Sequence, residues 1–304
     1  MSMMNARFSS IRDGKIIYHM NSGNGLFCID FKMGDGKIVY HMNSYNGLFC
    51  LDFKLGDGKR EFYIYNLTTG KYKFIPLPYV IEPQLIKTMN IAFDPEKSED
   101  YDVVCVRLSV SEIQLRIAVY SSGDGVWRHS TECYDCNEYG AVDLCCDCGV
   151  FWNRAVHWVI QTGPFFCFEI GNCSFRSMPT TPIPEEQSQR NIEYFGESVG
   201  HLHLIGQNSH QSTKFDIFEL EVDYSAWFVK YHVNLDSLPK LYPAMVNPPE
   251  EYVYSNVFST ICFLEDEKYK ARLLLGLPGK IILYNLGNGT IKELADVKPA
   301  SLSC

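Results

Sequence analysis

The 304-residue chain contains no uninterrupted apolar run of the roughly 18 residues that a membrane-spanning helix needs. Residues 1–10 also lack the apolar core of a secretory signal peptide. The formal net charge is -9, and the electric field of a negatively charged protein repels phosphate backbones. The sequence has no run of Lys or Arg that could form a basic face. These absences predict a cytoplasmic or nuclear protein that has neither a membrane nor a nucleic acid as its partner.

Motifs that carry chemistry are missing too. The chain has no G-x-S-x-G nucleophile elbow, no H-E-x-x-H zinc motif and no EF-hand loop. Acidic neighbours occur at 99–102, 185–186 and 250–251. Adjacent side chains in a strand point apart, so solvated loop charge is the favoured interpretation of these groups. We therefore expect a non-catalytic protein with no catalytic residue, no bound metal and no cofactor.

Cysteine is plentiful, with 12 residues, but without a secretory signal these are expected to stay as thiols. Five of them cluster beside His129, namely Cys133, Cys136, Cys145, Cys146 and Cys148. A CxxC pair followed by further thiolates suits tetrahedral zinc. The second group is a C-C-x-C at a short interval, however, which favours reduced thiols. Zinc binding by the Cys133–Cys148 cluster stays open.

His201 and His203 are two residues apart, so they share one face of a strand and could both reach a metal. No third ligand lies near them in the sequence. A pair of half-exposed strand histidines is the favoured interpretation.

Helical signals are scarce, because no window of helical length keeps the 3.6-residue period free of Gly, Pro or β-branched clusters. Aromatic residues, by contrast, make up 14% of the chain and suit pleated, half-buried surfaces. The Pro-rich stretches 76–83 and 179–184 are expected to be connections, because proline cannot donate to a β-ladder. An all-β fold with little helix follows.

The N-terminal region contains a near-perfect duplication with a period of 22 residues. GKIIYHMNSGNGLFCIDFKMGDGK at 14–37 is followed by GKIVYHMNSYNGLFCLDFKLGDGK at 36–59. Each copy has two strand-like runs around Asn- and Gly-rich turn residues, so each predicts one β-hairpin. We expect a short tail at 1–13 and a duplicated hairpin at 14–59 joined to the main domain, with one copy surplus to the fold.

Five further hairpins share one pattern: an apolar strand, a short polar turn, and a second strand that opens on a bulky residue. They lie at 62–78, 117–130, 165–179, 217–233 and 281–294. Trp127 and Trp227 occupy the same point in two of them, as packing anchors should. Repeated hairpins of this kind suit a β-propeller, although a β-sandwich stays open. At about 40–50 residues per blade the chain has room for six or seven blades.

Eight short motifs follow one another along the chain. They are NGLFC at 46–50, YNLTTGKYKFIPLP at 65–78, VYSSGDGVWRHS at 119–130, GVFWNRAVHWV at 149–159, FEIGNCSFRSMP at 168–179, ESVGHLHLI at 197–205, ELEVDYSAWFVKYHVNL at 219–235 and ILYNLGNGTIKEL at 282–294. Together they resemble the F-box-associated β-propeller domain of plant F-box proteins, a kelch-like fold, over residues 36–298.

The resemblance implies a protein-binding propeller, the part of an SCF-type ubiquitin ligase that recognises the protein to be degraded. In that family a helical F-box before the propeller holds the adaptor of the cullin ligase. Only residues 1–13 precede the first hairpin here, so the adaptor is not expected to bind directly. The chain is then a truncated relative, an incomplete sequence or a free binding module.

Two alternatives remain beside this protein-binding function. One is a propeller enzyme or carbohydrate-binding module with acidic side chains or a metal at its centre. The other is a duplicate that has lost its function. Trp152 and Tyr254 are candidate binding hot spots if they are exposed, whereas Trp158 lies in an apolar strand and is expected to pack inside.

Overall fold

The computed structural model describes residues 15–20, 27–32, 38–54, 59–66, 68–77, 86–109, 114–135, 149–159, 165–180, 191–207, 212–246, 258–266, 268 and 270–296. Almost all of the regular structure in these ranges is β-strand. Among the residues described, the helices are one turn, α1 (Leu238–Leu241), and a 3-10 turn (Pro243–Met245). Within the same ranges, no helix is long and apolar enough to cross a membrane. The expected low helix content is confirmed.

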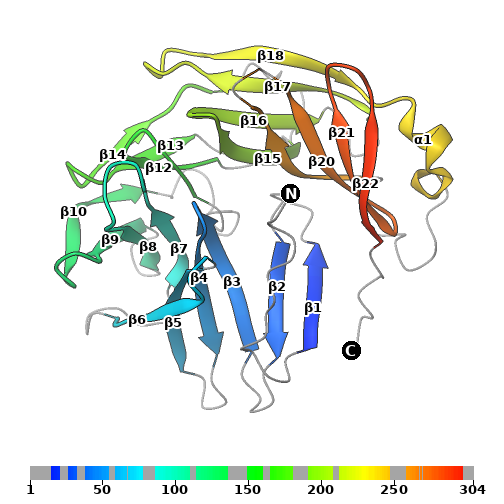
Figure 1. Cartoon of the computed structure of the whole chain (residues 1–304). Coiled ribbons are helices and arrows are strands. Elements are labelled where there is room, and N and C mark those ends of the chain that lie inside the picture. Colours follow the sequence, from blue (N-terminus) through cyan, green and yellow to red (C-terminus); the bar gives the residue numbers. More distant parts are fainter. Residues whose placement is uncertain are drawn as a thin grey trace. The chain divides into compact units, whose positions relative to one another are not determined.

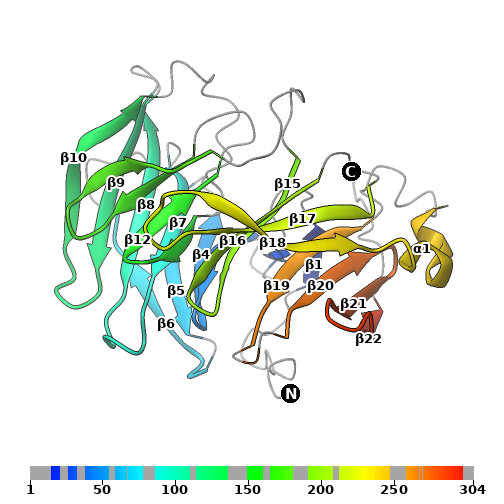
Figure 2. The same cartoon turned by 90° about the horizontal axis from the view of Figure 1, so that it is seen from above.

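The chain divides into two compact units, the first made of Met1–His19, Cys28–Trp158 and Phe166–Arg176, the second of Met20–Phe27, Val159–Phe165 and Ser177–Cys304. The first unit holds three sheets (Figure 1). Its six-stranded sheet has the order β1 (Lys15–Met20), β2 (Phe27–Lys32), β3 (Ile38–Tyr45), β4 (Leu48–Lys54), β5 (Arg60–Asn66) and β6 (Lys71–Ile75). Its two four-stranded sheets are β7 (Ile86–Ala92), β8 (Asp102–Ser109), β9 (Gln114–Ser121) and β10 (Trp127–Asp135), and β11 (Val150–Trp152), β12 (Ala155–Trp158), β13 (Phe166–Glu169) and β14 (Ser174–Ser177). Figure 2 shows β7 to β10 side by side from a second direction.

The second unit holds two four-stranded sheets. They are β15 (Asn191–Ser198), β16 (His201–Gln207), β17 (Lys214–Leu220) and β18 (Trp227–Asn234), and β19 (Ser259–Leu264), β20 (Arg272–Leu277), β21 (Lys280–Asn285) and β22 (Ile291–Asp296). Each sheet in this unit is a meander in which strands adjacent in sequence pair antiparallel. This is the repeated unit of a propeller blade.

The period-two alternation of the sequence decides which face of each strand is buried. On β5, Phe62 and Ile64 are buried while Tyr63 and Tyr65 are only partly so. The buried face packs with Met89 and other side chains of the next sheet into one hydrophobic core cluster. The core therefore lies between neighbouring sheets, where alternate side chains of each strand meet.

All five hairpins predicted from the shared pattern are confirmed as the outer strand pairs of the five sheets: β5–β6, β9–β10, β13–β14, β17–β18 and β21–β22. The predicted count of six or seven blades is wrong, because the described residues form five sheets, one for each blade. The inner strands of successive blades start at Ile38, Ile86, Val150, Asn191 and Ser259, intervals of 48, 64, 41 and 68 residues. Long connections between the blades leave fewer residues for further blades. In addition, both duplicated hairpins belong to one sheet, because β2 pairs with β3, so the first copy does not form a blade of its own.

Two tryptophans tie the outer strands in the same way. Trp127 opens β10, and its indole nitrogen donates to the Pro76 carbonyl at 2.5 Å; Trp227 opens β18 and donates to the Pro179 carbonyl at 2.9 Å. Each proline follows the outer strand of the preceding sheet in the chain. The predicted anchoring role of both side chains is confirmed. It holds because an indole N–H withdrawn from water, wholly in Trp227 and partly in Trp127, needs an acceptor, and a carbonyl at a strand end supplies one.

The inner strands of the first unit share a buried network of hydrogen bonds. The Asn43 amide donates to the Gly149 carbonyl at 3.0 Å and accepts the Ile91 N–H at 2.9 Å, and the Gly149 N–H donates to Asn90 Oδ1 at 2.8 Å. A side chain at Gly149 would find no room, since a Cβ there would lie 2.5 Å from Val156 Cγ1. These hydrogen bonds connect three sheets. Because the polar groups are buried, water could not replace a partner that was lost.

Candidate functional site

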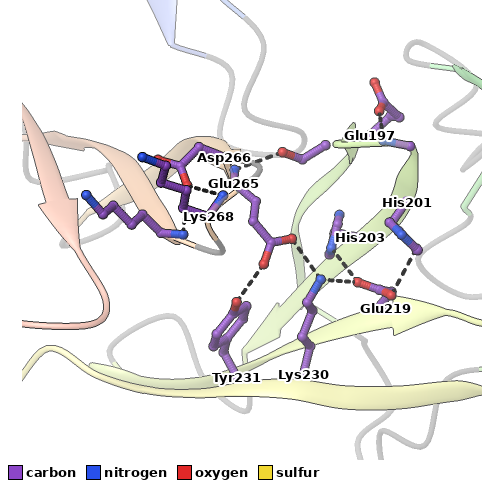
Figure 3. Close-up of polar contacts among 12 residues, drawn as sticks. Glu197, His201, His203, Glu219, Lys230, Tyr231, Glu265, Asp266 and Lys268 are labelled. Atoms are coloured by element: carbon purple, nitrogen blue, oxygen red, sulfur yellow. Dashed lines mark hydrogen bonds and ion pairs between the residues drawn. The ribbon is translucent and has the colours of Figure 1, made fainter.

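A cluster of six polar side chains lies in the second unit between β16, β17, β18 and the end of β19. We call it the Lys230 cluster, and its members are His201, His203, Glu219, Lys230, Tyr231 and Glu265 (Figure 3). Strand pairing brings the first of these together, because His203 lies directly opposite Glu219 in the β16–β17 register. His201 is two residues earlier and projects from the same face.

A β-bulge explains how Lys230 and its neighbour Tyr231 serve the same carboxylate. The β17–β18 register places Tyr231 opposite Ile217 and Val229 opposite Phe218, so Lys230 is an extra residue with no partner on β17. In a regular strand, adjacent side chains point to opposite faces. The bulge re-aims one of them. Lys230 Nζ then lies 2.7 Å from Glu265 Oε2 while the Tyr231 hydroxyl donates to Glu265 Oε1 at 2.6 Å.

The Lys230 ammonium is the centre of the cluster. It lies 2.5 Å from Glu219 Oε2 as well as 2.7 Å from Glu265, so one cation bridges two carboxylates. Glu219 Oε2 is also 3.0 Å from His203 Nε2, and its other oxygen lies 3.0 Å from His201 Nδ1. The Glu219 and Glu265 side chains are 8% and 2% exposed. Burial takes these ions out of water, and their mutual attraction and hydrogen bonds must offset the lost hydration.

The pKa shifts in the cluster follow from this arrangement. Burial works against a charged Glu219, but hydrogen bonds from His203 and Lys230 outweigh it and lower the pKa of this carboxyl to about 2. Burial also disfavours the Lys230 ammonium, yet its hydrogen bonds to the two carboxylates raise its pKa. The pKa of Tyr231 is raised by burial and by its bond to Glu265. Glu219 is therefore an anion and Lys230 a cation at neutral pH.

The cluster also contains a possible set of metal ligands. One donor atom from each of His203, Glu219 and Glu265 lies within 4.8 Å of the others. Imidazole and carboxylate donors suit zinc. The ammonium of Lys230, however, contacts both carboxylates, so the position that a cation would take is already filled by the chain's own charge. The side chains as they stand form an ion-pair cluster, which a metal could join only by displacing Lys230.

The predicted environment of the two histidines needs correction. His203 is completely buried, and only His201 is half-exposed as expected, with 39% of its side chain accessible. The third potential ligand, which the sequence did not reveal, is the carboxylate of Glu219, 16 residues beyond His203 but directly across the ladder. Pairing the 201–207 and 214–220 strands in register would have found it. Nothing local signals Glu265, which arrives from another sheet.

The other candidate residues are placed as follows. Trp152 was a candidate hot spot only if exposed; it is buried, with 6% exposure, so that condition is not met, and Trp158 is buried as expected. Cys133 is exposed at the end of β10. The remaining members of the cysteine cluster (136, 145, 146 and 148), the acidic pairs at 185–186 and 250–251, and Tyr254 lie outside the described residues.

Several described cysteines are free thiols deep in the core. Cys50, Cys105 and Cys167 are buried and unpaired by any disulfide. Burial raises the pKa of Cys105 and of Cys167 to about 12 in each case. A thiol that stays protonated is neither a nucleophile nor a good metal ligand, so these residues serve packing.

Comparisons with known proteins relate the chain to one family of β-propellers. A family model described as the KIB1-4 beta-propeller matches residues 15–239. The F-box protein At5g07610 of Arabidopsis thaliana is 30% identical over 257 residues, which cover 78% of this chain and 58% of that protein. The chain thus spans less than two thirds of the length of this relative.

Solved structures with similar coordinates are far more distant in sequence. YCF48 from Cyanidioschyzon merolae aligns with a TM-score of 0.47 at 8% identity, covering 92% of this chain and 84% of that one. Virginiamycin B lyase from Staphylococcus aureus aligns with a TM-score of 0.42 at 8% identity, covering 95% and 75%.

Proposed function

The chain belongs to the KIB1-4 β-propeller family, and we propose that it binds a target protein as the substrate-recognition part of an SCF-type ubiquitin ligase. The observation that carries this proposal is the 30% identity to an F-box protein over most of the chain. Propellers suit such a task because rigid blades present variable loops and edges to a partner. We further propose that the protein works in the cytoplasm or nucleus, which agrees with its free, buried thiols.

The Lys230 cluster supports binding over catalysis as the main role. A catalytic carboxylate needs a free acceptor aimed at substrate. Instead, the carboxylate oxygens of Glu219 and Glu265 are already bonded to the side chains of Lys230, His203 and Tyr231. We propose that this cluster holds the β15–β18 and β19–β22 sheets together and that the partner is recognised elsewhere on the surface.

The proposal is tested by affinity capture of the tagged chain from plant extract, with quantitative mass spectrometry of bound proteins. We expect at least one specific partner whose half-life shortens when the chain is overexpressed and recovers when the proteasome is inhibited. Recovery of the cullin-ligase adaptor in the same sample would show that the chain enters a ligase. A bound partner whose half-life does not change would contradict the degradation role, and the lack of any specific partner would contradict binding.

A metal-dependent propeller enzyme is the second candidate, and the approach of His203, Glu219 and Glu265 is the observation that favours it. Calorimetric titration with Zn²⁺ separates the two. Because Lys230 fills the site, we expect zinc binding in a Lys230→Ala variant and none at this site in the wild type. Zinc binding by the wild type that Glu219→Gln abolishes would support the enzyme instead.

A further inference from the structure

The outer strand of the first sheet carries an unusual group of exposed aromatic side chains. Tyr72 and Phe74 on β6 are 73% and 48% exposed. Among the described residues only one other aromatic side chain, Phe228 on β18, ranks with the exposed large hydrophobics. Aromatic side chains left in water at one place are a common mark of a protein-binding surface.

These two rings belong to a larger aromatic surface on one face of the sheet. Tyr63 of β5 lies opposite Phe74 in the register, and its ring centroid is 5.5 Å from that of Phe74, 5.9 Å from that of Tyr72 and 5.1 Å from that of Phe53. All three contacts are edge-on, a favourable geometry for aromatic pairs. The Tyr63 hydroxyl is held by Glu61 at 3.0 Å. We call these four rings, Phe53, Tyr63, Tyr72 and Phe74, the β6 aromatic strip.

The opposite face of the same strand is basic. Lys71 and Lys73 alternate with the two aromatic residues and are exposed, while Ile75 closes the strand inside the core. Lys73 donates to the Ser122 carbonyl at 3.3 Å, but no acidic side chain of the described residues pairs with either lysine in this structure. These two exposed lysines, which pair with no carboxylate among the described residues, could face acidic side chains of a partner.

The backbone of β6 is also open on one side. β6 is the last strand of its sheet, so β5 occupies one edge, and in the described part of the chain no strand occupies the other. An open edge can accept one more strand through main-chain hydrogen bonds. A second copy of β6 is a poor occupant, because antiparallel pairing of two such strands sets lysine beside lysine on one face. Acidic side chains on the incoming strand would instead be complementary.

From these observations we infer that the open edge of β6 binds an extended segment of a partner protein in which apolar and acidic residues alternate. The apolar side chains pack on the β6 aromatic strip, the acidic ones face Lys71 and Lys73, and the backbone continues the sheet. This inference rests on the proposed protein-binding function and assigns that function its surface and the chemistry of its partner.

The test uses the full chain and fluorescein-labelled ten-residue peptides, with binding followed by fluorescence anisotropy. The probe alternates Glu with Val and Phe; one control peptide has Lys in place of Glu, and another has the probe's composition with its acidic residues in one block. We expect only the alternating acidic peptide to bind, with affinity that falls as salt rises. A Tyr72→Ser/Phe74→Ser double variant should weaken it at least tenfold, and Lys71→Glu severalfold.

The matched control is Phe228→Ser, which removes a 37% exposed aromatic from the outer strand of another sheet and should leave peptide binding unchanged. Because all of these side chains are exposed, the variants should fold, and circular dichroism verifies that they do. Equal binding of the block peptide, an unchanged affinity in the double variant, or no binding of any peptide would each overturn the inference.

Affinity capture with the double variant separates this inference from the proposed function. Loss of the specific partners by Tyr72→Ser/Phe74→Ser but not by Phe228→Ser supports both. If the wild type captures specific partners and the double variant retains them, the chain binds proteins but not through β6. If the wild type captures none, the proposed function itself fails.

Discussion

Replacing Lys230 by methionine removes the charge at the centre of the Lys230 cluster but keeps most of the side-chain volume. Two carboxylates, 8% and 2% exposed, would then face each other without their shared ammonium. Breaking a buried ion pair by removing one partner costs about 3–5 kcal/mol. A typical domain is stable by about 5–15 kcal/mol, so this is a large share of the total. We expect Lys230→Met to lower the free energy of unfolding by about that amount.

The measurement is urea unfolding followed by circular dichroism, with the midpoint and slope compared between variants. Lys292→Met, an exposed lysine on β22 in the same unit, is the control and should change stability by less than about 0.5 kcal/mol. The double variant Lys230→Met/Glu265→Gln should recover part of the loss, because a neutral amide needs no counter-ion. A loss below about 1 kcal/mol, or a double variant no better than Lys230→Met, would refute the account of one cation holding two buried anions.

Three further predictions concern other parts of the chain. Gly149→Ala should cost about 2–3 kcal/mol in urea unfolding, because its Cβ meets Val156 at 2.5 Å, whereas Gly171→Ala, with open space around it, should be neutral; equal effects would contradict this. Val199→Asn should raise stability by about 1 kcal/mol and raise the melting temperature, because a β-branched residue is strained at φ 52°; an unchanged melting temperature would count against that strain. Burial lowers the pKa of His157 to about 4 from its usual 6.5, so the unfolded chain takes up a proton that the folded chain refuses. Stability should therefore fall by about 3 kcal/mol between pH 6.5 and pH 4, and a wild-type slope equal to that of His157→Gln would disprove the link.

Local signals in the sequence were enough to predict the duplicated hairpin and the five outer hairpins. Alternation places Phe62 and Ile64 inside and Tyr63 outside, and turn residues such as Asn46 and Gly47 take the positive φ angles that a tight turn requires. The number of blades was beyond such reasoning. It depends on the length of irregular connections and on which sheet the duplicated hairpin joins, and both are decided by pairing between distant strands.

The same limit applies to the Lys230 cluster. The spacing of His201 and His203 shows that they share a face, and the position of Glu219 follows once β16 and β17 are set in register. The aim of Lys230 does not follow, because a bulge breaks the alternation at that residue. Glu265 comes from a different sheet, and its place depends on packing that no local pattern encodes.

The Trp227 anchor also makes the chain suitable for optical study. The chain has four tryptophans, and Trp127, Trp152 and Trp158 all belong to the first compact unit, which leaves Trp227 as the sole indole fluorophore of the second. Its emission in a variant with the other three replaced by phenylalanine would report on that unit alone. If the Trp227 emission shifts at a lower denaturant concentration than the one at which the far-ultraviolet circular dichroism signal is lost, the two units unfold in separate steps.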